Sequence, residues 1–363
     1  MRLFQNSGLY PAYFPRLRAL TKGFTRFEDL RQVFLDDRYG ACHFLKPVLE
    51  SDPDAFFTNG DDEELQRAWA SEQGMSPQAG LPEILLAQIE HHRTEVFYNL
   101  DPIRYGSDFV RRLPGCVKHS IAWRAAPSPG ADFSAYSLVV CNFPSILKRY
   151  EDLGWRSAYF SPAHDPVMDR YAANTERPID VLFVGGYSRH HRRRAEVLEA
   201  VAKLRHELNI VFHLDRSRLT RLAESPLGRL LHLKKHRRPM DICAVTAEPV
   251  FGLDLYRALS KAKVVLNGAV DMAGEDRGNM RCFEAMGCGA LIVSDAGRYP
   301  EGMIDGQTIL TYSSIQQATA TIHLACSNTV SANKIAQRGY LLVSSKYSKG
   351  VQWDVFSSLV TSL

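Results

Sequence analysis

The sequence predicts an α/β protein built from two doubly wound parallel sheets, and two observations carry this prediction. Short apolar runs of strand length alternate along the chain with longer segments in which apolar residues recur at helical spacing. The chain also has 363 residues, which is too long for one ordinary core and suits two α/β domains. We therefore expect a first domain at residues 1–164, a linker at 165–178, a second domain at 179–348 and a final helix at 349–363 that packs back on the first domain.

Composition excludes several classes of protein. With 45% hydrophobic and 23% charged residues and a formal net charge of +4, the chain is an ordinary globular sequence and not a polycation. No apolar run approaches the roughly 18 residues that cross a membrane, and residues 1–8 lack a signal segment. The seven cysteines show no C-x-x-C pairing, which is typical of a reducing compartment. We expect a cytoplasmic protein.

The first domain is predicted from apolar strand runs that end in polar residues and from the helices between them. One helix carries apolar residues at helical spacing over 82–90, and another, over 144–152, begins with a proline in its first turn. The loop at 124–130 and the stretch at 161–166 contain too much proline or glycine for regular structure. Strands are expected at 2–8, 54–58, 95–99, 117–123 and 138–142.

The second domain repeats the alternation. Its first strand, at 179–184, is expected to run into a turn at Gly185 and Gly186. Further strands are expected at 210–214, 241–245, 262–267, 290–293 and 308–311. Helices are expected at 193–207, 253–260, 279–287 and 315–325, from 332 onward, and at 353–363. Ligands of open α/β sheets bind above the carboxyl ends of the strands, so the loops after these strands are the candidate sites.

The most informative of these loops is the run Asp276-Arg-Gly-Asn-Met-Arg-Cys-Phe-Glu284. Asn279 and Met280 open a helix, so their backbone amides are free to bind an anion. Arg281 adds a planar fork suited to phosphate, and Glu284 shares its helical face, where a carboxylate can accept from sugar hydroxyls. Asp276 can do the same from the preceding loop. The alternative is a surface ion pair between the acids and the arginine.

A second candidate for anion binding follows the strand at 179–184. Gly185 and Gly186 allow a ligand to approach the backbone closely. Arg189 and Arg192 place positive charge at a helix start, where it opposes the helix dipole unless an anion is bound. A solvated basic face or a nucleic-acid patch is the alternative. The three-glycine dinucleotide pattern is absent, which gives NAD binding little support.

Two weaker candidates lie elsewhere. The loop that contains Glu248, Pro249 and Val250 can seat a flat base against its apolar residues, or it is an ordinary strand-to-helix turn. His119 lies in a predicted strand and is a candidate catalytic group. A lone histidine on a mostly apolar strand is, however, more often a packed residue.

Other polar features limit the choice of partners. The basic run at 233–238 is either solvated or contacts anionic lipid head groups or an anionic acceptor. Aromatic residues do not interleave with it, so we expect no nucleic-acid partner. His164 and Asp165 have no further residues at metal-ligand spacing, and we predict no metal site.

Three segments of the second domain together resemble the GT-B glycosyltransferases of group 1. They are Val-Leu-Phe-Val-Gly-Gly at 181–186, Tyr-Arg-Ala-Leu-Ser-Lys-Ala-Lys-Val-Val-Leu-Asn at 256–267, and Asn-Met-Arg-Cys-Phe-Glu-Ala-Met-Gly-Cys-Gly at 279–289. The last segment is similar to the Asn-x-Arg-x-x-Glu-Ala signature of the spore-maturation-protein-like (CgeB-type) branch. The resemblance spans about residues 179–347, and the first domain matches in architecture only.

This resemblance implies a GT-B enzyme whose two Rossmann-like domains face each other across a cleft. The second domain would hold a nucleotide-diphosphate sugar and the first a glycan, lipid-linked or protein hydroxyl acceptor. Family members carry an E-x7-E pair, and here the spacing is kept but the first acid is Asp276. By resemblance, Glu284 binds the ribose and Asp276 lies near the donor sugar. The remaining matches are to groups around the diphosphate, namely Gly185, Gly186, Arg189 or Arg192, Asn279, Met280 and Arg281.

The activity implied by the resemblance is that of a retaining hexosyltransferase in surface polysaccharide biosynthesis. It needs no metal and no cofactor besides the donor. The basic run adds an expected peripheral contact with the inner face of the membrane. A sugar-nucleotide epimerase of the same fold is the first alternative, and a scaffold without activity or a basic binding module is the second.

Overall fold

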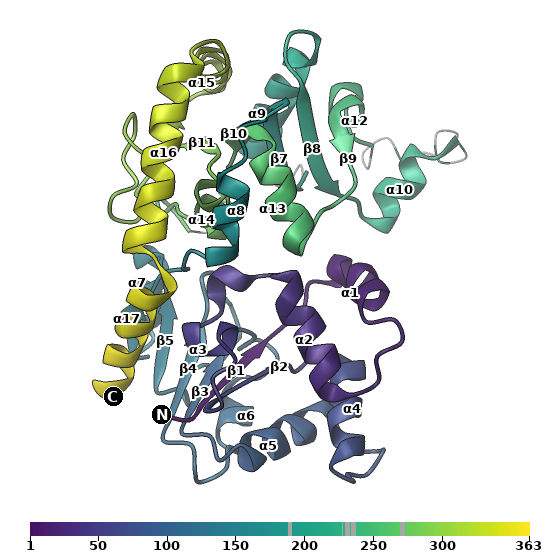
Figure 1. The fold of residues 1–363 in the computed structure, drawn as a ribbon, viewed down its shortest axis with the longest axis vertical. Helices are drawn as coiled ribbons and strands as arrows, with labels where there is room; N and C mark the ends of the chain where they lie inside the picture. Colours follow the sequence, from purple (N-terminus) through teal and green to yellow (C-terminus); the bar gives the residue numbers. More distant parts are fainter. Residues whose placement is uncertain (188–190, 227, 229–232, 234–236, 269–272) are drawn as a thin grey trace. The chain divides into compact units, whose positions relative to one another are not determined.

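The computed structural model describes residues 1–187, 191–226, 228, 233, 237–268 and 273–363, and the chain forms two compact units (Figure 1). Unit 1 comprises residues 1–165, 272–276 and 346–363, and unit 2 comprises residues 166–271 and 277–345. Each unit contains one six-stranded sheet. All neighbouring strands in both sheets run parallel. The predicted α/β class with two doubly wound parallel sheets is confirmed.

The sheet of unit 1 has the strand order β2-β1-β3-β4-β5-β6. Its strands are β1 (Leu3–Ser7), β2 (Ala55–Asn59), β3 (Val96–Asn99), β4 (His119–Trp123), β5 (Leu138–Cys141) and β6 (Ser157–Tyr159). The sequence predicts the first five but not β6, whose three residues are too few for a period to show. The helices are η1 (Pro11–Tyr13), α1 (Phe14–Leu20), α2 (Phe27–Asp37), η2 (Ala41–His43), α3 (Lys46–Leu49), α4 (Glu63–Glu72), α5 (Leu81–His91), α6 (Ser107–Val110), α7 (Pro144–Asp152) and α17 (Lys349–Thr361).

The sheet of unit 2 has the order β12-β11-β10-β7-β8-β9. Its strands are β7 (Ile179–Gly186), β8 (Ile210–Asp215), β9 (Thr246–Ala247), β10 (Ala262–Leu266), β11 (Leu291–Asp295) and β12 (Leu310–Tyr312). The helices are η3 (Pro166–Met168), α8 (Asp169–Ala172), α9 (Arg192–Ala202), η4 (Lys203–His206), α10 (Arg218–Glu224), α12 (Met240–Val245), α13 (Gly252–Ser260), α14 (Met280–Gly287), α15 (Ile315–Ser327) and α16 (Thr329–Lys346).

Two local predictions for unit 2 are wrong. The strand expected at 241–245 is the helix α12, whose N-cap is Pro239. Ile242 and Val245 are buried at i, i+3 spacing, which is a helical period that a five-residue apolar run does not separate from a strand. The turn expected at Gly185 and Gly186 is also wrong, because both residues continue β7 and pair with the end of β8.

The core of unit 2 lies on both faces of its sheet. Val264 of β10 and Val293 of β11 are fully buried on one face, together with Val201 of α9 and Ile322 of α15. Their strand neighbours Val265 and Ile292, which point to the other face, are also fully buried. A parallel sheet covered by helices on both faces has such near-continuous apolar strands. The apolar strands end in polar residues, and those ends position the candidate site.

The helix α17 belongs to unit 1, although it closes the chain. Nζ of the buried Lys349 donates to the carbonyl oxygens of Ala41 at 2.6 Å and Phe44 at 2.7 Å. Phe356 of the same helix packs against Tyr98 of β3, with ring centroids 5.0 Å apart. Hydrogen bonds and aromatic packing therefore fix this helix on the unit that begins the chain.

Candidate functional site

The carboxyl ends of the strands of unit 2 lie at one edge of the sheet, because all of its neighbouring strands run parallel. Ligands of open α/β sheets bind at this edge. Small or polar residues stand at or just after the strand ends there, namely Gly186, Asp215, Glu248, Asn267, Asp295 and Ser313.

Asn267, which follows β10, joins three neighbouring elements at this edge. Its Nδ2 donates to Oγ of Ser294 in β11 at 3.1 Å, and its Oδ1 accepts from Nδ2 of Asn279 at 3.3 Å. Its carbonyl oxygen accepts from the hydroxyl of Tyr312 in β12 at 3.1 Å. These bonds hold the start of α14 against the ends of β10 and β11.

The start of α14 has the geometry of an anion site. Gly278 has a φ of +93°, a left-handed conformation that favours glycine, and Asn279 is the N-cap in an extended conformation. The helix begins at Met280, so the predicted helix start is confirmed. The first amides of a helix have no acceptor within the helix and carry the positive end of its dipole. An anion at this corner would accept from them.

Arg281 and Glu284 form an ion pair on α14, with Nη1 2.6 Å from Oε2. The side chain of Arg281 is 17% exposed and that of Glu284 is 2% exposed, so the pair is buried. The alternative considered from the sequence was an ion pair on the surface. Burial raises the pKa of Glu284, and the charge of Arg281 opposes that rise. Nε of Arg281 is buried without a hydrogen-bond partner among the described residues. An anionic oxygen would satisfy this donor.

Two arginines that the sequence does not single out also lie at this edge. Nε of Arg277 is 2.5 Å from Oδ2 of Asp295 at the end of β11, and both side chains are nearly buried. The side chain of Arg194 in α9 lies beside Gly268, where an added Cβ would be 3.3 Å from Cγ of the arginine. Arg194 is the half-buried member of a run of three arginines, and the other two are exposed. Its position on the face of α9 that turns toward the sheet could have been predicted from the helical period.

The predicted arginines before and at the start of α9 have different outcomes. Arg192 is 87% exposed and pairs with Glu196 one turn along, with Nε 2.8 Å from Oε1. This is the solvated basic face that the sequence allowed as an alternative. Arg189 lies outside the described residues. Gly186 has open space where a Cβ would be, so the backbone at the end of β7 is approachable.

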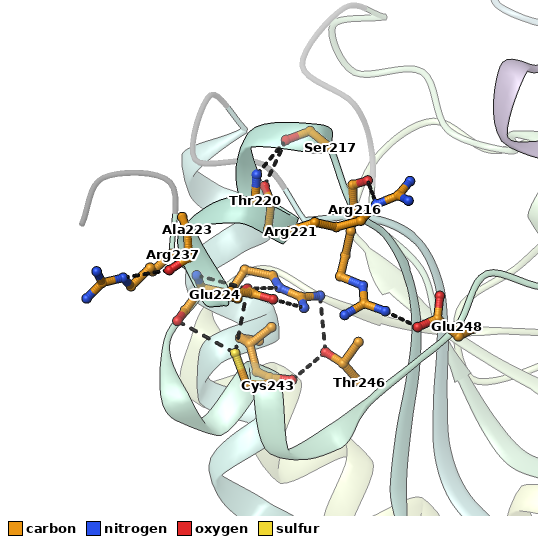
Figure 2. A network of polar contacts seen from close by, with 12 residues as sticks. Arg216, Ser217, Thr220, Arg221, Ala223, Glu224, Arg237, Cys243, Thr246 and Glu248 are labelled. Carbon is orange, nitrogen blue, oxygen red and sulfur yellow. Dashed lines mark hydrogen bonds and ion pairs between the residues drawn. The ribbon is translucent and has the colours of Figure 1, made fainter. Parts of the chain in front are cut away.

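The predicted base-binding loop after β9 is held by residues of β8 and the loop after it. The Glu248 carboxylate pairs with Arg216, as Figure 2 shows, and the carbonyl oxygen of Glu248 is 2.5 Å from Nδ1 of His213. Burial lowers the pKa of His213, so the neutral ring donates from Nδ1 to that carbonyl. Pro249 and Val250 are half-buried beyond this anchor.

The described arginines of the basic run at 233–238 bond to other groups of unit 2. Nε of Arg238 is 2.6 Å from Oε1 of Glu224 in a pair that is 5% and 17% exposed. Arg237 donates to the carbonyl oxygen of Ala223 at 2.9 Å, close to the end of α10 (Figure 2), and to that of Gly228 at 2.7 Å. Residues 234–236 lie outside the described residues. The described part of the run is thus a structural network.

Asp276 lies in unit 1 and is 1% exposed. Its Oδ2 accepts the backbone N–H of Ser145 at 2.6 Å, and Oγ of Ser145 donates to the carbonyl oxygen of Ala273 at 2.8 Å. Ser145 is in the first turn of α7, so the carboxylate caps the positive end of that helix. The predicted place of Asp276 near a donor sugar stays a prediction.

His119 is the first residue of β4, and its N–H donates to the carbonyl oxygen of Glu95 at 3.2 Å. It therefore lies at the amino edge of the sheet of unit 1, opposite to the edge at which such sheets bind ligands. This position favours the packed alternative and gives no support to a catalytic role.

The carboxyl edge of unit 1 carries a polar cluster that the sequence analysis missed. The order β2-β1-β3 places a topological switch point between β1 and β3. Gly8 follows β1, and a Cβ there would be 2.9 Å from Oδ2 of Asp101, which follows β3. Asp61 follows β2 and accepts the N–H of Leu9 at 2.9 Å. Burial, with the charge of Asp101, raises the pKa of Asp61 to about 6.

The described residues contain neither a metal-ligand cluster nor a helix that could span a membrane. No group of three or more histidines, cysteines, aspartates or glutamates in the described part of the chain is arranged to hold a metal ion. None of the described helices combines the length and the apolar character needed to span a bilayer.

Residues 194–352, from α9 to α17, match the model of a family described as glycosyl transferase-like. The match includes the α14 corner and the whole of the loop with Glu248. It covers less than half of the chain and does not distinguish the spore-maturation-protein-like branch. A search of curated protein sequences finds no match.

Several solved structures share the fold over the whole chain. Anabaena HepE, in complex with UDP and glucose, is 12% identical with a TM-score of 0.58, and each chain is covered fully. A glycosyltransferase from Rickettsia africae is 10% identical with a TM-score of 0.55, over 99% of this chain and 97% of the other. Sucrose-phosphate synthase from Thermosynechococcus elongatus is 12% identical with a TM-score of 0.55, over 99% and 98%. At these identities the similarity shows the fold, and the GT-B fold class is confirmed.

Proposed function

We propose that the protein is a glycosyltransferase that moves a sugar from a nucleoside-diphosphate donor to a hydroxyl acceptor. The observation that carries the proposal is the α14 corner, where the helix start, Arg281 and Glu284 lie at the carboxyl edge of the sheet of unit 2. The glycosyl transferase-like family model matches across this corner. HepE, which shares the fold, was solved with UDP and glucose.

The chemistry of the corner suits a departing diphosphate. Breaking the bond between sugar and phosphate develops oxocarbenium character on the sugar and negative charge on the leaving group. The amides of Met280 and Arg281, the first two residues of α14, have no acceptor within the helix. Nε of Arg281 has no hydrogen-bond partner among the described residues. Fixed donors aimed at developing charge stabilise the transition state. We assign them the diphosphate, which makes a catalytic metal unnecessary.

Glu284 has two proposed roles in this site. Its carboxylate holds the guanidinium of Arg281 in place, and its second oxygen accepts from the ribose of the donor. The base is proposed to lie against Pro249 and Val250, in the loop fixed by Arg216 and His213. Asp276, which caps α7, and His119, at the amino edge, are given no part in the chemistry.

The acceptor is proposed to bind at the carboxyl edge of unit 1. Asp61, with a pKa of about 6, and Asp101 are carboxyl groups at the switch point of that sheet. A carboxylate there can accept a hydrogen bond from an acceptor hydroxyl and take up its proton. We further propose that the enzyme uses a hexose donor and retains the configuration at the anomeric carbon. Its acceptor is a glycan, a lipid-linked molecule or a protein, and the reaction belongs to surface polysaccharide biosynthesis in the cytoplasm.

The test is a product assay. The protein is incubated with a panel of sugar nucleotides, with and without glycan acceptors, and mass spectrometry follows both the sugar and the released nucleoside diphosphate. The proposal expects release that depends on an acceptor and is lost in Arg281→Ala. Conversion of the donor into an isomer without an acceptor would assign the epimerase alternative. No turnover of any donor, together with no binding of any nucleoside diphosphate, would overturn the proposal.

A further inference from the structure

We propose that the segment from Tyr10 to Arg26 is a membrane-contact surface that docks on anionic lipid head groups. The sequence from 8 to 27 contains no acidic residue and four cations. The inference is independent of the proposed enzymatic activity, because it rests on a surface of unit 1 and not on the candidate site.

Apolar side chains are exposed around one tight turn of this segment. Leu20, the last residue of α1, is 38% exposed, and Phe24 is 43% exposed. Between them the N–H of Phe24 donates to the carbonyl oxygen of Thr21 at 3.0 Å. Gly23 has a φ of +91° with no atom within 4 Å of a Cβ position, so the tip of the turn faces solvent. Tyr10, before η1, is 48% exposed.

The same segment is held to unit 1 by its other side chains, so the exposed ones form a fixed surface. Tyr13 and Leu17 are buried, and the side chain of Thr21 donates to the carbonyl oxygen of Leu17 at 2.9 Å. Two cations face unit 1, since Arg16 pairs with Asp37 at 2.6 Å and Arg18 pairs with Asp62 at 2.5 Å. Because these contacts fix the segment, the turn does not rearrange to bury Leu20 and Phe24, and both side chains stay exposed.

The two remaining cations of the segment indicate which partner the surface binds. Lys22 and Arg26 are exposed, and neither forms an ion pair with any described residue. Apolar side chains on a turn between cations fit the boundary between head groups and acyl chains of an anionic bilayer. A protein partner for the same surface would need complementary acids and a concave apolar face, whereas a bilayer supplies both chemistries without a matching shape.

The location connects this surface to the acceptor side. Leu9, which immediately precedes the segment, donates its N–H to Asp61 at the carboxyl edge of unit 1. A bilayer that contacts Leu20 and Phe24 would thus lie against the segment that leaves that edge. The described arginines of the basic run at 233–238 bond to groups of unit 2, and residues 234–236 lie outside the described residues, so the inference rests on the segment from Tyr10 to Arg26 alone.

The test is co-sedimentation of the full chain with vesicles of phosphatidylcholine alone and with vesicles containing about one third phosphatidylglycerol. We expect binding to the anionic vesicles only, weakened by salt. Leu20→Ser with Phe24→Ser, and separately Lys22→Glu with Arg26→Glu, should each lower the bound fraction at least about fivefold. The matched controls are Ile103→Ser with Leu153→Ser, at exposed apolar sites of unit 1, and Arg112→Glu with Arg149→Glu, at exposed cations. They should bind as the unchanged protein does.

Three results would overturn the inference. One is no binding to anionic vesicles at low salt. Another is an equal loss in the control variants, which would mean that net charge or general apolarity decides binding. The third is a dimer in light scattering that Leu20→Ser with Phe24→Ser dissociates, which would assign the surface to a second copy of the chain. Thermal unfolding is measured for all four variants as a control. An unchanged melting temperature shows that a variant has lost membrane binding without losing its fold.

Discussion

Arg281 and Glu284 form a buried ion pair one turn apart on α14, with 2.6 Å between Nη1 of the arginine and Oε2 of the glutamate. The pair couples the stability of unit 2 to the proposed donor site. Removing one partner of a buried pair leaves an uncompensated charge, which costs about 3–5 kcal/mol. Donor binding and folding stability therefore have to be measured together at this position.

The first prediction concerns the pH dependence of Arg281→Ala. The pKa of Glu284 is already raised by burial, and loss of the arginine raises it further. The folded variant then binds more protons than the unfolded chain, so its stability falls as pH rises above the ordinary glutamate range. Chemical denaturation should show a loss of about 3–5 kcal/mol near pH 8 and a smaller loss near pH 5.

Two controls accompany this measurement. Arg257→Ala removes an exposed ion pair with Asp254 on α13 and should cost less than about 1 kcal/mol at both pH values. Adding Glu284→Gln to Arg281→Ala should remove the pH dependence. An equal loss for Arg281→Ala at both pH values would contradict the account, because it would mean that the carboxyl group does not carry the effect.

The second prediction separates capping from catalysis at Asp276. Its carboxylate caps α7 through the N–H of Ser145. Asp276→Ala should therefore cost about 1–2 kcal/mol of stability. Turnover measured below the melting transition should stay within about threefold, because the proposed mechanism gives this carboxylate a capping role and no part in the chemistry. A loss of turnover by two orders of magnitude at unchanged stability would instead give Asp276 a part in the chemistry.

The third prediction concerns Asp61 at the proposed acceptor edge. Its carboxyl group has a pKa of about 6 in the folded protein against an ordinary value of 3.8. The folded state binds more protons between these values, so the stability contribution is present at low pH and is lost as pH rises through about 6. Asp61→Asn should gain roughly 1–2 kcal/mol relative to the unchanged protein between about pH 4 and pH 7. A difference between the two proteins that stays constant with pH would contradict the raised pKa.

The fourth prediction concerns the ion pair of Arg238 with Glu224, a residue at the centre of the network in Figure 2. Arg238→Met leaves the glutamate without its partner and should cost about 3–5 kcal/mol. Combining it with Glu224→Leu should recover most of that loss, because an apolar pair has no charge to desolvate. Thermal and chemical unfolding measure the loss of stability in the single variant and its recovery in the double variant. No recovery in the double variant would show that hydrogen bonds to Thr246 and Cys243, and not the charge pair, hold α10.

Features that depend on neighbours in sequence were predictable here. The strand and helix order, the start of α14 at Met280 and the proline in the first turn of α7 follow from local periodicity and turn chemistry. The pairing of Arg281 with Glu284 follows from i, i+3 spacing. These features use information carried within a few residues.

Features that depend on tertiary contact were missed. The carboxyl groups of Asp61 and Asp101 follow different strands, and only the strand order brings them to one edge. Asp276 finds its partner 131 residues away in sequence. The half-buried Arg194 and the exposed Arg192 differ only in helical phase. The period of the short α12 run stayed ambiguous because five residues do not separate a strand from a buried helix.

The central claim is that the α14 corner binds the diphosphate of a sugar nucleotide, and calorimetric titration with nucleoside diphosphates tests it most directly. The account predicts saturable binding of at least one nucleoside diphosphate. Arg281→Ala should weaken it by about 2 kcal/mol, or roughly 30-fold, measured near pH 5 where the variant is expected to be most stable. Lys334→Ala, at an exposed cation of α16, should bind as the unchanged protein does. No binding of any nucleoside diphosphate, or equal binding by folded Arg281→Ala, would contradict the claim.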